Sequence, residues 1–276
     1  MENNNPLSLM YITNSPIIAQ CVEESGIDYL FIDLETIGKE KRQKNLDTVK
    51  SHHSFEDISV VRPFLHNSKL LVRINPFYEN TKNEVEKAIS NGADAIMLPM
   101  FENASQVKQF VEFVNKRAEV ILLLETIEAK NNLRDILTIP GIDRIHIGLN
   151  DLHLQMKKKF MFELLVDGTV EEIINKIKQT DIKYGFGGVS RIGDGILPAT
   201  NILSYHYYLN SSSVILSRSF CNLEKTNVND ARLILKKGVA DLRNYYSQLK
   251  KKDDNYFKNN YLEMKSLIGK IVEGNL

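Results

Sequence analysis

Short apolar runs alternate with segments of helical periodicity along almost the whole chain. Most of these runs are continuously apolar, which is typical of strands that are buried on both faces of a parallel sheet. The predicted strands are Leu7–Ile12, Tyr29–Asp33, Leu70–Ile74, Ala95–Leu98, Val120–Leu124, Arg144–Ile147, Phe186–Val189 and Val214–Leu216. Eight such runs with helices between them favour a (β/α)8 barrel over a β-sandwich.

The segments between the runs carry helix signals. Ser105–Lys116 places four apolar side chains on one face of a helix. Thr81 with Glu84, and Thr169 with Glu172, fit the capping-box pattern at helix starts. Glycines stand where a helix should stop, just before three of the strands: Gly26, Gly92 and Gly141.

The pattern therefore predicts an α/β protein, with one (β/α)8 TIM barrel domain over residues 1–276. A doubly wound open sheet is the main rival, and the absence of GxGxxG after the first strand weighs against it. Residues 252–272 read as an additional C-terminal helix. Its apolar stripe consists of Phe257, Tyr261, Met264, Leu267, Ile268 and Ile271. We expect this stripe to lie at the subunit interface of a homo-oligomer, the alternative being that it covers the barrel itself.

Composition and charge exclude several classes of partner. The 276-residue chain has 35 basic and 35 acidic residues, so no net charge draws it to nucleic acid or to a membrane. No apolar run reaches the roughly 18 residues of a membrane span. Cys21 and Cys221 suggest no disulfide framework, and Cys21 falls in an apolar helical pattern that predicts a buried thiol. The polar N-terminus has no apolar signal core, so a cytoplasmic location is expected.

Polar residues end the predicted strands, where barrel active sites gather. These residues are Asp33, Glu35, Arg73, Glu125, Asn150, Asp151, Ser190, Arg191 and Arg218. Glu125 and Asp151 are the natural ligands for a hard cation, because two carboxylates with water and substrate oxygens suit Mg²⁺ or Mn²⁺. The alternative is that each carboxylate only bridges an arginine.

Four stretches of the chain resemble the HpcH/HpaI aldolase and citrate lyase β-subunit family. Leu122–Met156 carries the family's E-T-x-x-A turn, its PGID step and its G-x-N-D-L segment. Asp28–Glu35 is similar to the family's second strand, Leu70–Pro76 to its arginine strand and Asn91–Met100 to its fourth strand. The resemblance covers residues 8–220.

This resemblance implies a lyase or aldolase that makes or breaks a carbon–carbon bond next to a 2-oxo acid. Glu125 and Asp151 would bind Mg²⁺ or Mn²⁺. Arg73 would face the substrate carboxylate and the developing enolate oxygen, and the backbone at Gly148 and Asn150 would hold the carboxylate. The chemistry is consistent, because a metal and a guanidinium can both stabilise an enolate.

One departure leaves the proton-transfer group open. Pyruvate aldolases of the family have a histidine after the second-strand acidic residue, and this chain has Thr36 there. Threonine cannot act as a general base near neutral pH. Glu35, His153 and a metal-bound water are the candidates for this role.

A second departure concerns the far end of the barrel, which carries two arginines at strand ends. Arg191 and Arg218, with Lys39 or Arg42, could clamp a phosphate or a second carboxylate of the substrate. The alternative for Arg218 is an ion pair with a structural carboxylate such as Asp33.

The leading hypothesis is therefore a metal-dependent carbon–carbon lyase acting on an acidic 2-oxo or hydroxy acid, with a sugar acid or phosphorylated sugar among the candidate substrates. The alternatives are an acyl-CoA lyase, a phosphoenolpyruvate-type enzyme of the same superfamily, and a metal- or ligand-binding barrel without catalysis. No adenine- or pantetheine-binding signature is legible, which disfavours the thioester alternative.

Overall fold

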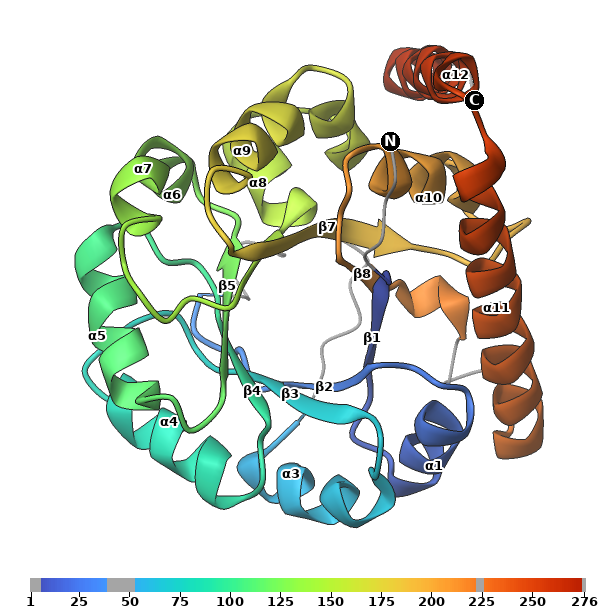
Figure 1. Cartoon of the computed structure of the whole chain (residues 1–276). Coiled ribbons are helices and arrows are strands. Elements are labelled where there is room, and N and C mark those ends of the chain that lie inside the picture. Colours follow the sequence, from blue (N-terminus) through green and yellow to red (C-terminus); the bar gives the residue numbers. More distant parts are fainter. Residues whose placement is uncertain (1–5, 39–52, 222–225, 275–276) are drawn as a thin grey trace.

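A closed barrel of eight parallel strands forms the centre of the computed structural model, which describes residues 6–38, 53–221 and 226–274. Each strand pairs with its neighbours in sequence, and β8 closes the barrel against β1 (Figure 1). The strands are β1 (Ser8–Ile12), β2 (Tyr29–Asp33), β3 (Lys69–Arg73), β4 (Ala95–Leu98), β5 (Glu119–Leu124), β6 (Arg144–Ile147), β7 (Lys183–Val189) and β8 (Ser213–Leu216). The predicted (β/α)8 barrel is confirmed.

Helices surround this barrel as an outer ring (Figure 1). The α-helices are α1 (Pro16–Glu24), α3 (Phe55–Val61), α4 (Thr81–Ser90), α5 (Ala104–Val114), α6 (Ile127–Asn131), α7 (Leu133–Ile136), α8 (Leu149–Gln155), α9 (Thr169–Ile177), α10 (Ala199–Tyr208), α11 (Val228–Gln248) and α12 (Asp254–Glu273). Short 3-10 turns are η1 (Arg62–Phe64), η2 (Met161–Leu165), η3 (Arg218–Phe220) and η4 (Leu249–Lys251).

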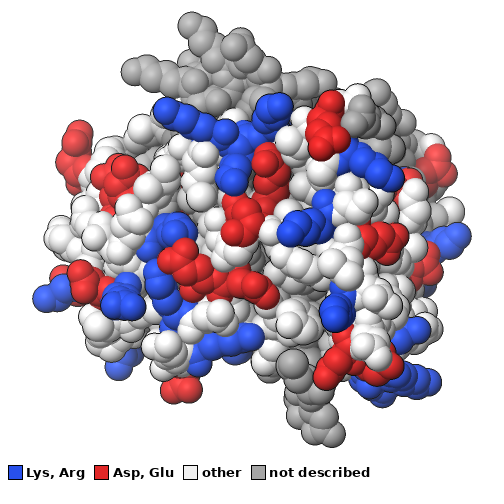
Figure 2. Space-filling view, turned by 90° about the horizontal axis from the view of Figure 1, so that it is seen from above, with Lys and Arg blue, Asp and Glu red and all other residues white. Residues whose placement is uncertain are grey.

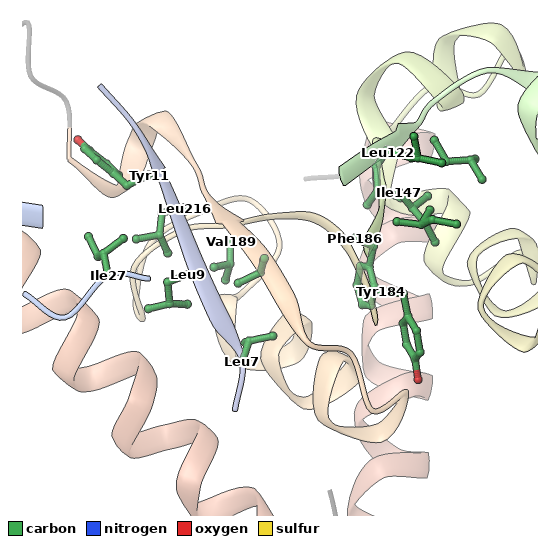
Figure 3. Close-up of a cluster of buried hydrophobic side chains, with 14 of the residues drawn as sticks. Leu7, Leu9, Tyr11, Ile27, Leu122, Ile147, Tyr184, Phe186, Val189 and Leu216 are labelled. Carbon is green, nitrogen blue, oxygen red and sulfur yellow. The ribbon is translucent and has the colours of Figure 1, made fainter. Parts of the chain in front are cut away.

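Two apolar layers hold the barrel together. Successive side chains of a strand point to opposite faces, so each strand contributes to both layers. The inner layer fills the barrel with Met10, Tyr29, Phe31, Leu71, Ala95, Met97, Ile121 and Leu123. The outer layer lies between strands and helices, and Figure 3 shows part of it, including Leu9, Leu122, Ile147, Phe186 and Leu216. Burial on both faces explains why the strand sequences are continuously apolar.

A Gly-x-Asp sequence recurs before three strands. Gly26, Gly92 and Gly141 all have positive φ angles, of 68°, 104° and 92°, which glycine adopts readily. The aspartate two residues later turns its carboxylate back onto the preceding strand. Asp94, for example, accepts a hydrogen bond from the backbone N–H of Leu70 at 2.8 Å. The helix stops predicted at Gly26 and Gly92 are confirmed, because each glycine directly follows a helix C-cap, whereas Gly141 lies four residues beyond Leu137, the C-cap of α7.

Both predicted capping boxes are wrong. The N-cap of α4 is Asn80, and the hydroxyl of Thr81 accepts a hydrogen bond from the Tyr78 N–H instead. The N-cap of α9 is Gly168, and Glu172 pairs with lysine side chains. Glu84 instead accepts hydrogen bonds from Asn75 and Tyr78.

The C-terminal helix packs on its own chain. Helix α12 lies outside the ring beside α10 (Figure 1), and Phe257, Met264 and Ile268 of the predicted stripe are buried. The ring of Phe257 stacks on Tyr207, with 5.5 Å between the centroids. The chain itself therefore covers much of the stripe, as in the alternative left open by the sequence. The predicted subunit interface stays a prediction.

Charges of both signs share the side of the molecule drawn in Figure 2, where acidic and basic side chains are interspersed. In the part of the chain that the structure describes, no helix is both long and apolar enough to cross a membrane. Cys21 is fully buried, as predicted.

Candidate active site at the barrel mouth

Three charged side chains lie at the carboxyl ends of the strands. Asp33, Arg73 and Glu125 each come two residues after a member of the inner apolar layer, so they point into the same end of the barrel. The opposite end is closed by a polar cluster in which Tyr29 donates a hydrogen bond to Glu119 at 2.8 Å. The charged cluster at the carboxyl ends is therefore the candidate active site.

Arg73 is held by a carboxylate from the neighbouring strand. Its Nε and Nη2 atoms donate hydrogen bonds to the two oxygens of Asp33, both at 2.9 Å. Residues Asp33 and Arg73 face each other in the register of β2 and β3, which makes this pair possible. Glu35 adds a second carboxylate, 3.5 Å from Nη2. Since the bonds to Asp33 use Nε and Nη2, the Nη1 amine is not part of that pair.

The electrostatics keep this guanidinium charged. Burial by itself would lower the pKa of Arg73, but the charges of Asp33, Glu35 and Glu125 together raise it above its ordinary value. The side chain of Arg73 is 16% exposed, whereas those of Asp33 and Glu35 are nearly inaccessible. The mouth of the barrel thus presents a permanent, oriented cation.

Glu125 sits in a recess shaped by its neighbours. Its Oε1 accepts a hydrogen bond from the N–H of Met100 at 3.3 Å, and Met100 has a left-handed backbone with φ of 51°. A Cβ atom at Gly148 would lie 2.7 Å from Glu125 Oε2, so only glycine leaves room for this carboxylate. Strained backbone of this kind is typical of functional sites.

The E-T-x-x-A turn places Glu125 by local capping. Thr126 is the N-cap of α6, and its Oγ1 accepts a hydrogen bond from the N–H of Ala129 at 3.0 Å. The same hydroxyl donates to the carbonyl of Phe101 at 2.7 Å. Because Thr126 is anchored both to its own helix and to the segment after β4, Glu125 has a fixed position at the end of β5.

Asp151 and His153 both lie on α8, the helix that follows β6. Asp151 is half-buried in the first turn, three residues after Gly148, and Asn150 precedes it. His153 is buried, and its Nδ1 lies 3.2 Å from the carbonyl of Leu149. Residues two positions apart in an α-helix are separated by about 200° around its axis, so Asp151 and His153 point in different directions. This geometry argues against His153 as the proton-transfer group near Asp151.

The donor set at the mouth fits a hard cation only if the substrate contributes ligands. Among the described residues there is no group of three or more histidine, cysteine or acidic side chains that could hold a metal. Glu125 and Asp151 would supply two carboxylates, with the remaining ligands from water and substrate oxygens. Such a set is usual for Mg²⁺ and Mn²⁺.

The two arginines at the far end have different surroundings. The Nε and Nη2 atoms of Arg191 both contact Oδ2 of Asp194, at 2.9 and 2.7 Å, and its aliphatic stem packs near Gly238 of α11. Arg218 is exposed in η3, directly after β8. Asp33, which was one candidate partner of Arg218, pairs with Arg73 instead. Lys39 and Arg42 lie outside the described residues.

Sequence reasoning missed two groups that hold the end of β2. The N–H of Asp33 donates a hydrogen bond to Nδ1 of His53 at 3.0 Å. Beyond it, Asn75 Oδ1 accepts from the N–H groups of Thr36 and Ile37 at 2.8 and 2.9 Å. No motif marks either contact, because both join a side chain to a distant backbone N–H. Thr36, at the position of the family histidine, is therefore bound to Asn75.

Comparison with known proteins agrees with this architecture. The model of the HpcH/HpaI aldolase/citrate lyase family matches residues 7–185, a range that contains Arg73, Glu125 and Asp151 but neither Arg191 nor Arg218. An HpcH/HpaI aldolase from Desulfitobacterium hafniense DCB-2 has a similar structure, with a TM-score of 0.61 and 15% identity over 85% of this chain and 92% of that protein. The citrate synthase SbnG gives a TM-score of 0.61 with 16% identity, over 87% of this chain and 96% of that one.

A curated relative also aligns with part of the chain. The thiamine-phosphate synthase of Methanococcus maripaludis (strain C5) is 24% identical over 138 residues, which are 50% of this chain and 63% of that protein. The chain thus spans less than two thirds of that relative's length. The identities to the two solved structures are low enough that those likenesses show the fold alone.

Proposed function

Because the chain belongs to the HpcH/HpaI aldolase/citrate lyase family, we propose that it is a divalent-metal-dependent lyase or aldolase. The proposed reaction makes or breaks a carbon–carbon bond next to the carbonyl of an acidic 2-oxo or hydroxy acid. The observation that carries this proposal is the Arg73–Asp33 pair at the barrel mouth, with Glu125 close enough to influence the same guanidinium.

The proposed reaction generates a negative charge that the site must stabilise. When the carbon–carbon bond breaks, its electron pair passes to the 2-oxo acid, whose carbonyl oxygen becomes an enolate oxygen. Arg73 is oriented before any substrate arrives, and its Nη1 amine lies outside the pair with Asp33. A preorganised cation beside the developing oxyanion lowers the barrier without reorganisation.

Glu125 and Asp151 would hold the metal, and the substrate carboxylate would meet the backbone at Gly148 and Asn150. A divalent metal bound there would act as a Lewis acid for the 2-oxo acid. The recess around Glu125, bounded by Met100 and Gly148, supports this assignment because it fixes one carboxylate at the end of β5.

Glu35 is the proposed proton-transfer group. In the cleavage direction, the hydroxyl of the carbon that becomes a carbonyl must lose a proton to a base. Glu35 is buried at the mouth and 3.5 Å from Arg73, whereas His153 lies on a different face of α8 from Asp151. In the reverse direction Glu35 returns this proton to the new alkoxide.

Arg191 and Arg218 are proposed to bind a distal phosphate or carboxylate of the substrate. The pair of Arg191 with Asp194 is partly exposed, so a substrate anion could compete for this guanidinium. Both arginines lie beyond the residues matched by the family model. The family match therefore does not indicate which distal group the substrate carries.

Turnover of a panel of 2-oxo acids with aldehydes, with Mg²⁺ or Mn²⁺ present, tests the proposal. We expect turnover that chelation by EDTA abolishes, and a ~10²–10³-fold loss of kcat/KM in Arg73→Ala, as for other preorganised donors. Arg117→Ala is the matched control, because Arg117 pairs with Glu86 on the exposed outer surface. No turnover by the metal-loaded protein, or a normal rate in Arg73→Ala, would contradict the proposal. Cleavage of hydroxyacyl-CoA thioesters alone would favour the acyl-CoA lyase.

A further inference from the structure

The end of β2 pairs with β3, where the Leu34 N–H donates to the Arg73 carbonyl at 2.9 Å, and side chains hold it on the other side. The N–H of Asp33 binds His53, and the next contacts along the chain bind Asn75. Asn75 is itself fixed, since its own N–H and its Nδ2 donate to Glu84 at 3.0 and 2.8 Å. The segment from Asp33 to Ile37 is thus tied by two side chains as well as by β3, and it carries Asp33 and Glu35, whose carboxylates lie within 3.5 Å of Arg73.

The contact with Asp33 determines the state of the His53 ring. A backbone N–H can only donate, so Nδ1 of His53 must accept and carries no proton. The neutral ring then has its hydrogen on Nε2. A doubly protonated ring would turn an N–H toward another N–H and lose this contact. His53 therefore acts on Asp33 as an acceptor.

A displacement of the Asp33 backbone would disturb both hydrogen bonds between Asp33 and Arg73. Both oxygens of Asp33 bind Arg73, and Oδ1 also accepts a hydrogen bond from the Glu35 N–H at 3.3 Å. The side chains of Asp33 and Glu35 are buried, so no water can replace a lost contact without rearrangement. A shift of about 1 Å in such a site costs on the order of 10²-fold in rate.

The other described histidines have different environments. His66 is exposed in the turn before β3, at the opposite end of the barrel. His146 is buried in the wall of the barrel, while His153 and His206 are buried in helices. Within the described ranges, His53 is the histidine that binds the carboxyl end of a strand at the mouth.

We propose that His53 is a positioning residue of the site. By accepting the Asp33 N–H across a separation of 20 residues, it sets the orientation of the Asp33 carboxylate and, through it, of the Arg73 guanidinium. The kinetic consequence rests on the proposed lyase function, whereas the geometric consequence does not.

Two substitutions distinguish this role from contact with the substrate. The side-chain oxygen of asparagine can take the place of Nδ1, and the side-chain amide of glutamine can take the place of Nε2. His53→Asn should therefore restore the bond to Asp33, and His53→Gln should not. We expect kcat to fall at least tenfold in His53→Gln with a smaller change in KM, and to be largely restored in His53→Asn. His66→Asn is the control for loss of an exposed imidazole.

A spectroscopic measurement separates this inference from the lyase proposal. In ¹⁵N-labelled protein, the Arg73 Nε–H, identified from Arg73→Lys, should exchange slowly with solvent because Asp33 holds it. His53→Gln should accelerate this exchange and shift the Asp33 N–H resonance, while His53→Asn should leave both near their original values. This pattern supports the inference even if no substrate is turned over.

Three results would overturn the inference. Wild-type exchange of the Arg73 Nε–H in both His53 variants would show that His53 does not position the pair. Restoration of kcat by glutamine rather than asparagine would place the function of His53 at Nε2. Equal damage in both variants, with the Asp33 resonance unshifted, would indicate that His53 acts elsewhere.

Discussion

Replacement of Asp33 by asparagine tests whether the buried Asp33–Arg73 pair stabilises the barrel mouth. Asparagine has nearly the same shape as aspartate, but it keeps only one acceptor oxygen and turns an N–H group toward the guanidinium. One charge-assisted hydrogen bond is lost, and Arg73 loses the carboxylate that binds it at two points. The substitution therefore changes the charge and the bonding of the pair while leaving the packing volume unchanged.

The expected loss of stability follows from burial. Breaking a buried pair costs about 3–5 kcal/mol, because the remaining charge is left uncompensated. Glu35 remains 3.5 Å from Nη2, and Arg73 is 16% exposed, so the lower end of this range applies. We therefore expect Asp33→Asn to lower the free energy of unfolding by about 3 kcal/mol.

The chain supplies a matched control for this experiment. Arg191 and Asp194 form an ion pair of similar length, 2.7 Å, but their side chains are 36% and 44% exposed. Exposed pairs contribute about 0–1 kcal/mol, so Asp194→Asn should cost less than 1 kcal/mol. Urea unfolding of both variants at neutral pH measures the difference. Equal losses in the two variants, or no loss in Asp33→Asn, would refute the assignment of stability to burial of the pair.

Three further predictions concern the rest of the fold. In urea unfolding, Gly92→Ala should lower the free energy of unfolding by about 2–3 kcal/mol, because φ is 104° and the new Cβ would lie 3.2 Å from the Arg62 side chain. Gly26→Ala is the control, since its new Cβ meets no atom, and it should cost about 1 kcal/mol. Burial lowers the pKa of His146 from 6.5 to about 4. Between these pH values the unfolded chain binds a proton that the native chain does not, so the free energy of unfolding should fall as the pH drops from 6.5 toward 4. A set of urea curves across this range should show a flatter decline in His146→Gln, and an unchanged slope would count against this account. If α12 contributes to an oligomer, Leu262→Glu on its exposed face should reduce the mass measured by light scattering, and an unchanged oligomer would exclude that face.

The fold could be predicted from sequence because the barrel leaves a signal at nearly every strand position. Side chains on both faces of each strand are buried, so the strands read as continuous apolar runs. The predicted bounds agree with those of β2, β4 and β6 and differ by one residue or so for most others. β7 is the exception, since it begins at Lys183 rather than Phe186 because glycines interrupt its apolar pattern.

The site could be predicted only in part. Arg73 and Glu125 were recognisable because charged residues at the ends of buried strands need a partner or a ligand. Their partners were not, because a pair such as Asp33–Arg73 depends on strand register. Glu84 was assigned to a capping box but binds Asn75, and the sequence does not distinguish these two uses of one carboxylate.

His53 illustrates the limit most clearly. Its partner is the backbone N–H of Asp33, and a backbone group leaves no trace in the choice of the residue that carries it. The long segment between them gives no periodicity from which their proximity could be inferred. Contacts of this type become visible only in the folded barrel, where His53 lies beside Asp33.

Crystals soaked with Mg²⁺ and oxalate, a mimic of the enolate, test the central claim most directly. Glu125 and Asp151 should bind one cation with metal–oxygen distances of about 2.1 Å, and Arg73 should contact an oxygen of the bound oxalate. A cation bound elsewhere would contradict this claim. So would carboxylates of Glu125 and Asp151 that remain more than about 7 Å apart, beyond the reach of two such bonds.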